Sequence, residues 1–335
     1  MESLTKRRIT ESELAILVRH AFAGRAEVKG WRELADGSYN AAYAVTLDDG
    51  TELILKIAPP PELKLLTHEV DLMHTEADFY RRAAAAGVAV PRVLHAGFDR
   101  GPIGTDFIFL SRVDGVALNT VAEQLEPAEL ASVRRQAAAR AARLHTVTGP
   151  AYGYPLRGSR SWQHSWRAAF GAMLADILDD AARLGRRLPA PPERFLALVR
   201  RHADLLDEVD RPALVHFDLW DGNVFVRTDA PGGARVTGFI DGERALYGDP
   251  VAELVSLLLR RDLEDEPEIL DGYNGAGHGR IEPTRSVRRR LDLYTCYLYL
   301  IMLVEGATRG WSGPERDQVE AWLSEQLAVL LDRLA

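Results

Sequence analysis

Residues 214–226 constrain the fold of this chain more than any other stretch. They read LVHFDLWDGNVFV, so three polar side chains are spaced as H-x-D-x-x-x-x-N between apolar runs. These side chains are His216, Asp218 and Asn223, and Asp241 follows a second apolar run. Apolar runs that flank polar residues predict a loop held between buried strands. Four such residues in this order are hard to explain as an incidental surface loop, so they predict a built site.

The sequence between Asn223 and Asp241 predicts a hairpin. Residues 229–233 read DAPGG, which is a turn composition, and they lie between two apolar runs. An antiparallel pair folded about Gly232 would bring Asn223 and Asp241 side by side at its open end. Their oxygen atoms would then converge, as a hard cation such as Mg²⁺ prefers. Asp218, five residues before Asn223, would face the same cleft.

The residue types of this loop predict phosphoryl transfer, a reaction that depends mainly on positioning and on neutralisation of charge. We expect Asp218 to orient the substrate hydroxyl or to accept its proton. We expect Asn223 and Asp241 to bind the Mg²⁺ that bridges the phosphates of ATP. His216 is expected to order the loop, and Asp249 to cap the start of a helix.

A lysine and a glutamate in the N-terminal third complete this expected site. Lys56 lies in the apolar run ILKI, and a kinase needs such a lysine to hold the α- and β-phosphates. A helix glutamate must aim the lysine, and Glu76 lies in the middle of a predicted helix at 68–86. Glu69, seven residues earlier and on nearly the same helix face, is the alternative. Ser38 could donate a hydrogen bond to a phosphate.

The spacing of apolar residues predicts an α+β chain of two lobes. Residues 1–111 contain several strand-like runs and one central helix, and a D-G pair at 49–50 predicts an antiparallel hairpin. Residues 112–335 have mostly helical spacing. We therefore expect a small antiparallel β lobe at 1–111 that binds the nucleotide. A larger, mainly helical lobe at 112–335 would carry catalysis and bind the substrate.

Composition limits the partners of the chain. The 335 residues include 41 Lys and Arg against 49 Asp and Glu, a net charge of −8, which argues against nucleic acid as a partner. No run is long and apolar enough for a membrane span or a signal core, so we expect a cytoplasmic protein. No obligate protein partner is evident. The single cysteine, Cys296, lies in an apolar helical stretch and is expected to be buried and inert.

Together these residues resemble the aminoglycoside phosphotransferase-like kinases, which also include fructosamine, choline and homoserine kinases. The resemblance is carried by HFDLWDGN at 216–223, which is also similar to the fructosamine kinase loop, by IDG at 240–242 and by GDP at 248–250. It implies a bilobal protein-kinase-like fold, with ATP and Mg²⁺ as cofactors. It also implies that FLSRVDG at 109–115 is the hinge, where the backbone of Ser111 and Val113 would hold adenine.

Three residues limit which kinds of kinase the chain resembles. Phe217 stands where many members of the family have glycine, and its ring would narrow the cleft. Trp220 replaces the lysine that protein-substrate kinases usually have two residues after the catalytic aspartate, and Gly242 replaces the phenylalanine of D-F-G. Too few residues separate Asp241 from the GDP motif to form an activation loop. The sequence therefore predicts a small-molecule kinase.

The sequence says less about the identity of the acceptor substrate than about the phosphate donor. The acidic run DLEDEPE at 262–268 could attract an amine-bearing substrate, although a solvated acidic loop is the more ordinary interpretation. We predict phosphoryl transfer from ATP to a hydroxyl of an amine-bearing small molecule such as an aminoglycoside or an amino sugar. A ketosamine or an amino alcohol is the alternative substrate. A non-catalytic nucleotide-binding relative is the other class, and the intact Asp218, Asn223, Asp241 and Lys56 argue against it.

Overall fold

The computed structural model describes residues 3–35, 37, 39–156 and 158–335. Its N-terminal part is a five-stranded antiparallel sheet of order β1-β2-β3-β5-β4. The strands are β1 (Val28–Leu34), β2 (Ala41–Leu47), β3 (Glu52–Ile57), β4 (Val93–Gly97) and β5 (Phe107–Ser111). The predicted D-G hairpin joins β2 to β3, and Gly50 has the positive φ of +85° that such a tight turn needs.

Two helices pack with this sheet. Helix α1 (Glu11–Ala21) begins at Thr10 with a capping box, and its Leu14 and Leu17 join a core formed by the buried side of the sheet. Helix α2 (Leu72–Ala85) is shorter than predicted. A 3-10 turn, η1 (Thr67–Glu69), precedes it, and Asp71 with φ +55° separates the two elements. The expectation that Glu69 and Glu76 share one helix face is therefore wrong.

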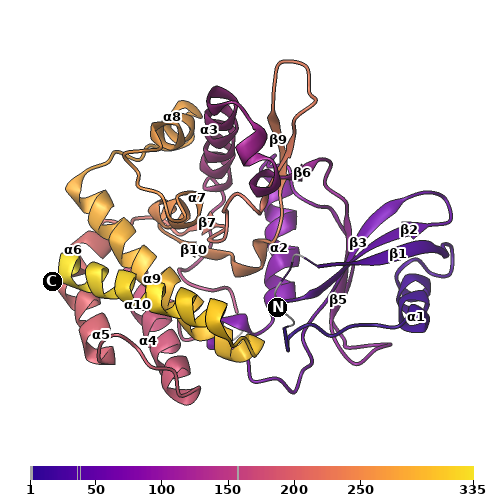
Figure 1. Cartoon of the computed structure of the whole chain (residues 1–335), viewed down its shortest axis with the longest axis horizontal. Helices are drawn as coiled ribbons and strands as arrows, with labels where there is room; N and C mark the ends of the chain where they lie inside the picture. The colour runs from indigo at the N-terminus through magenta and orange to yellow at the C-terminus, as the bar shows by residue number, and fades with distance from the viewer. Residues whose placement is uncertain (1–2, 36, 38, 157) are drawn as a thin grey trace.

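The remainder of the chain is mainly helical (Figure 1). Its helices are α3 (Pro127–Leu144), α4 (Trp166–Arg183), α5 (Pro192–Arg201), α6 (Ala203–Leu206), α7 (Leu254–Leu257), α8 (Pro267–Gly275), α9 (Arg285–Arg309) and α10 (Pro314–Leu334). Short 3-10 turns are η2 (Leu118–Thr120), η3 (Ala122–Gln124), η4 (Gly242–Arg244) and η5 (Pro250–Glu253). Among the described residues, no helix has both the length and the apolar character needed to cross a membrane.

Two small sheets carry the polar motif. Strands β6 (Val116–Ala117), β8 (Val224–Arg227) and β9 (Arg235–Phe239) form one of them. Strands β7 (Ala213–Val215) and β10 (Leu246–Gly248) form the other. The loop between β7 and β8 contains His216, Asp218 and Asn223, and the turn after β9 contains Asp241. The predicted loop between buried strands is thus present.

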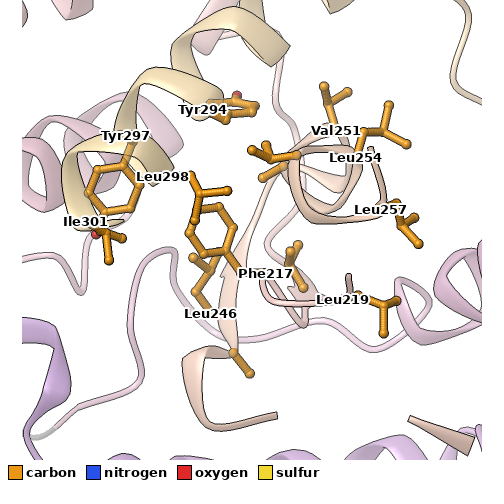
Figure 2. Close-up of a cluster of buried hydrophobic side chains, with 14 of the residues drawn as sticks. Phe217, Leu219, Leu246, Val251, Leu254, Leu257, Tyr294, Tyr297, Leu298 and Ile301 are labelled. Atoms are coloured by element: carbon orange, nitrogen blue, oxygen red, sulfur yellow. The ribbon is translucent and has the colours of Figure 1, made fainter. Parts of the chain in front are cut away.

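A hydrophobic cluster supports this loop from the helical side. Figure 2 shows Phe217 and Leu219 of the loop among side chains from β10, η5, α7 and α9. Phe217 is 1% exposed, and its ring centroid lies 5.8 Å from that of Tyr297 on α9. The ring points into the core, so the expectation that it narrows the cleft is wrong.

Candidate active site

Lys56 lies at the centre of the interface between the sheet and the loops that carry the motif. Its Nζ donates to Oε1 of Glu76 on α2 at 2.6 Å and also pairs with Asp241. Tyr80 connects the same groups, because its hydroxyl donates to Glu76 Oε1 at 2.6 Å and accepts from the Asp241 N–H at 3.0 Å. Burial alone would lower the pKa of Lys56, but the carboxylates of Asp241 and Glu76 raise it well above its ordinary value.

Glu69 is not the partner of Lys56. It lies in η1, where its carboxylate pairs with Arg309 of α9 and accepts from the Leu66 N–H at 3.0 Å. The structure thus brings Lys56 together with Glu76, the preferred candidate.

A buried glutamate holds the backbone of the 216–223 loop. Glu253 of η5 is fully buried, and its carboxylate accepts from the backbone N–H groups of His216 at 2.8 Å and Phe217 at 3.0 Å. Phe217 has φ +64°, a left-handed conformation that non-glycine residues adopt only when their surroundings enforce it. We did not single out Glu253 from the sequence. The feature of the sequence that could have revealed it is a carboxylate within the apolar run 251–259, because an isolated charge in a buried segment needs buried partners.

His216 links the two loops of the motif. Its Nδ1 accepts from the Asp218 N–H at 3.3 Å, so Nε2 carries the proton and donates to the Ile240 carbonyl at 2.8 Å. This bonding agrees with the predicted ordering role. Asp249, as predicted, caps a helical turn by accepting from the Val251 N–H at 3.0 Å.

Asp218 and Asn223 lie in contact. Asn223 Nδ2 donates to the Asp218 carbonyl at 2.7 Å and to its Oδ2 at 3.3 Å. This contact turns Oδ1 of Asn223 away from Asp218, so that oxygen remains available as a ligand. Burial raises the pKa of Asp218 to about 6, although the guanidinium of Arg244 opposes this effect.

The hairpin that carries Asp241 differs from prediction by one residue. Val224 pairs with Phe239, and the Ile240 N–H donates to the Asn223 carbonyl at 3.0 Å. Asn223 therefore lies opposite Ile240, and Asp241 follows one position later in a left-handed turn with φ +59°. The cause is that the hairpin folds about Pro231 and not about Gly232, since Arg227 pairs with Arg235. A bulge between Phe225 and Val226 then brings the register one residue closer to the predicted one.

The residues expected to bind magnesium are few. Among the described residues, no group of three or more histidine, cysteine or acidic side chains is arranged to hold a metal ion. Asn223 and Asp241 supply one amide and one carboxylate oxygen at the same end of the hairpin. These are the hard ligands that Mg²⁺ accepts, and substrate phosphates and water normally complete its coordination. The donor set therefore fits a metal that binds together with a nucleotide.

One of the two backbone segments expected to hold adenine already forms a hydrogen bond within the protein. The Ser111 N–H donates to the Arg92 carbonyl at 2.9 Å, so this N–H is not available to adenine. Val113 lies two residues beyond β5, and its side chain packs beside Gly238 of β9. Ser38 lies outside the described residues.

A chain of ion pairs lies behind the loop. Arg244 Nη2 donates to Glu305 Oε2 at 2.6 Å, and Glu305 lies 3.7 Å from the guanidinium of Arg309. Arg309 in turn pairs with Glu69 of η1. These contacts join the turn after Asp241 to helix α9 and to the segment before α2. Glu305 and Arg309 are four residues apart on α9. No local pattern reveals the other two pairs, because their partners are 61 and 240 residues apart.

Arginines neutralise Glu264 and Glu266 of the acidic run at 262–268. Glu266 accepts two hydrogen bonds of 2.9 Å from Arg134 and lies 3.0 Å from Arg261. Both arginines also pair with Asp221 of the loop, at 3.2 and 3.1 Å. Glu266 therefore holds the loop, and its charge is already engaged and not free to attract an amine.

Comparisons with known proteins identify relatives of this chain. The family described as "Phosphotransferase enzyme family" matches residues 30–294. A curated relative is "Probable ketoamine kinase YniA" of Escherichia coli O157:H7, 26% identical over 269 residues, which cover 75% of this chain and 79% of the relative.

Solved structures share the fold. A Thermobifida fusca protein described as a "putative fructosamine-3-kinase" is 20% identical, with a TM-score of 0.64 over 96% of this chain and 100% of that one. The streptomycin–ATP complex of APH(2'')-IIa is 14% identical, with a TM-score of 0.62 over 97% and 99% of the two chains. These similarities confirm the predicted α+β, protein-kinase-like fold.

Proposed function

The chain belongs to the phosphotransferase enzyme family, and from this premise we propose that it transfers the γ-phosphoryl group of ATP to a hydroxyl of an amine-bearing sugar. The observation that carries the proposal is the convergence of Lys56, Glu76 and Asp241, with Asp218 and Asn223 on the adjoining loop. Such a constellation suits a reaction in which positioned charges stabilise the phosphoryl group in transit.

Each side chain has a proposed role. Lys56, aimed by Glu76, would bind the α- and β-phosphates, and the backbone of Val113 would contact adenine. Asp218 would orient the acceptor hydroxyl and receive its proton, and a pKa of about 6 leaves it mostly ionised at neutral pH. Asn223 Oδ1 and the Asp241 carboxylate would hold Mg²⁺. The metal would neutralise charge on the phosphates.

We place the boundary between the two lobes after β5, at Ser111. Residues 1–111 would then bind the nucleotide, and residues 112–335 would carry the catalytic loop and the acceptor site. The sheet ends there, and the next described strand, β6, pairs with β8 of the second lobe.

A ketosamine is the favoured acceptor within this class. The 26% identical relative carries the name of a ketoamine kinase, and the pairing of Glu264 and Glu266 with arginines weakens the case for a polycationic aminoglycoside. An aminoglycoside remains the second candidate, because the streptomycin complex of APH(2'')-IIa shares the fold over nearly the whole chain.

Turnover of Mg-ATP with a panel of ketosamines, amino sugars, aminoglycosides and amino alcohols tests the proposal. We expect a ketosamine to be phosphorylated. Asp218→Ala should abolish transfer while ATP binding, measured by calorimetry, is retained. ATP binding without transfer to any panel member would support a non-catalytic relative, and an active Asp218→Ala variant would overturn the role of Asp218.

A further inference from the structure

A hollow of about 720 Å³ lies in the helical lobe between α7, the segment 258–264 and the facing parts of α9 and α10. None of the residues assigned above to the nucleotide or to catalysis lines it. The carboxyl end of α10, which forms one wall, lies at the end of the molecule opposite the five-stranded sheet (Figure 1). Its volume falls within the range of small-molecule sites in proteins. We call it the α7–α10 hollow.

The floor of the hollow is apolar and aromatic. It includes Leu254, Leu258, Leu291 and Leu330, together with Tyr299 and Trp322. The rings of Tyr299 and Trp322 meet edge to face, with centroids 5.3 Å apart. Trp322 is half-buried, and a ring of this kind provides a large contact area for an apolar ligand at little cost in side-chain entropy.

The rim of the hollow is positively charged, although the whole chain carries −8. Six arginines line it, against three acids: Asp262, Glu264 and Asp292. Arg288 pairs with Glu264, Arg333 pairs with Asp292 at 3.0 Å, and Arg261 is engaged with Asp221 outside the hollow. Within the described part of the chain, Arg260, Arg285 and Arg289 have no carboxylate at ion-pairing distance.

The positive charge and the aromatic floor meet at one point. The guanidinium of Arg260 lies 4.7 Å from the centroid of the Trp322 ring. Arg260 reaches this position from a left-handed backbone conformation, with φ +62°. An unpaired cation in contact with an aromatic surface is suited to a ligand that combines an apolar body with a negative group.

We propose that the α7–α10 hollow is a binding site for a small amphipathic anion, a molecule with an aromatic or alkyl body and a single carboxylate, sulfonate or phosphate group. The apolar body would lie on Tyr299 and Trp322. The anionic group would pair with Arg260 and Arg285 at the rim. The site is separate from the phosphotransferase site, and the proposal does not depend on the acceptor substrate.

Binding of 8-anilinonaphthalene-1-sulfonate, a fluorescent amphipathic anion, tests the proposal on the full chain. We expect saturable binding of one equivalent, unaffected by saturating Mg-ADP. Energy transfer from tryptophan to the bound probe should fall in Trp322→Phe. The double variant R260E/R285E should weaken binding about tenfold, because it replaces two attractive charges by repulsive ones.

The double variant R32E/R81E is the matched control. It makes the same change of charge at two exposed arginines on β1 and α2, in the part of the molecule that carries the five-stranded sheet, so it should bind the probe like the unmodified chain. 1-Naphthoate and 1-naphthyl phosphate should both displace the probe, whereas neutral 1-naphthol at the same concentration should not.

Four results would overturn the proposal. They are the absence of saturable binding, full displacement by Mg-ADP, equal affinity in R260E/R285E and the unmodified chain, or equal displacement by 1-naphthol. Sedimentation velocity tests whether a second copy of the chain, and not a small molecule, occupies the hollow. If the chain forms a dimer that only R260E/R285E dissociates, the hollow is an interface between two copies and not a small-molecule site.

Discussion

Replacing Phe217 by glycine tests how the 216–223 loop is held. The left-handed backbone of Phe217 costs a non-glycine residue about 1–2 kcal/mol, and glycine would remove that cost. Loss of its buried ring costs about 3–5 kcal/mol. The flexibility of glycine in the unfolded chain costs a further 0.5–1 kcal/mol or so. Packing outweighs strain, so we expect Phe217→Gly to lower the free energy of unfolding by about 3 kcal/mol.

Phe217→Ala is the comparator, because it loses the ring but keeps the strained Cβ. We expect it to be about 1 kcal/mol less stable than Phe217→Gly. Urea unfolding followed by tryptophan fluorescence measures both variants, and an unchanged m-value supports the comparison. If Phe217→Gly equals the unmodified chain, the ring does not pack as Figure 2 shows. If Phe217→Ala is the more stable variant, the backbone is not strained.

Other predictions concern the site more directly. Because burial raises the pKa of Asp218 to about 6, its ionised form is lost below that pH. We therefore expect kcat/KM to fall about tenfold per pH unit there, and Arg244→Gln should move this limb of the pH profile to higher pH. Lys56→Met should lower kcat/KM by about 10²–10³, and retention of the circular dichroism spectrum would exclude unfolding. Glu253→Gln should lower the free energy of unfolding by about 2 kcal/mol, because one backbone N–H of the loop loses its acceptor; an unchanged urea midpoint would contradict this. Burial raises the pKa of Cys296 to about 12, so a disulfide reagent should modify it only in denaturant.

Local patterns were sufficient to predict the elements that form the core of the site. The D-G pair at 49–50 was sufficient to predict the hairpin that carries Lys56, because few other residue pairs tolerate such a tight turn. Glu76 reaches Lys56 because α2 continues through it without interruption. The order of polar residues in 216–223 was sufficient to predict a loop between buried strands.

Features that depend on contacts distant in sequence were not predictable. The β8–β9 hairpin folds about Pro231 and contains a bulge, so Asp241 lies one position beyond the residue opposite Asn223, and symmetry about Gly232 could not reveal this. Asp71, which has a left-handed backbone conformation, separates Glu69 from α2. Glu69 instead forms an ion pair with Arg309, which is far from it in sequence.

Glycine content alone is a poor guide to flexibility. Residues 272–279 contain four glycines, and those after α8 lie in a partly exposed segment, but Gly272 lies within α8 and is buried against α3. A Cβ at Gly272 would lie 2.1 Å from the Arg135 carbonyl, so glycine there permits close helix packing and not flexibility.

Lys56 pairs with both Glu76 and Asp241, and this arrangement has a consequence for the way in which a nucleotide would enter the site. If Lys56 binds phosphate and Asp241 binds Mg²⁺ as proposed, each side chain would exchange the other for a ligand, because the two pair directly. Entry of Mg-ATP would then be an exchange of partners that leaves neither charge uncompensated. Each half of the exchange makes the other easier, so the metal and the nucleotide should bind with positive cooperativity, and free Mg²⁺ alone should bind weakly.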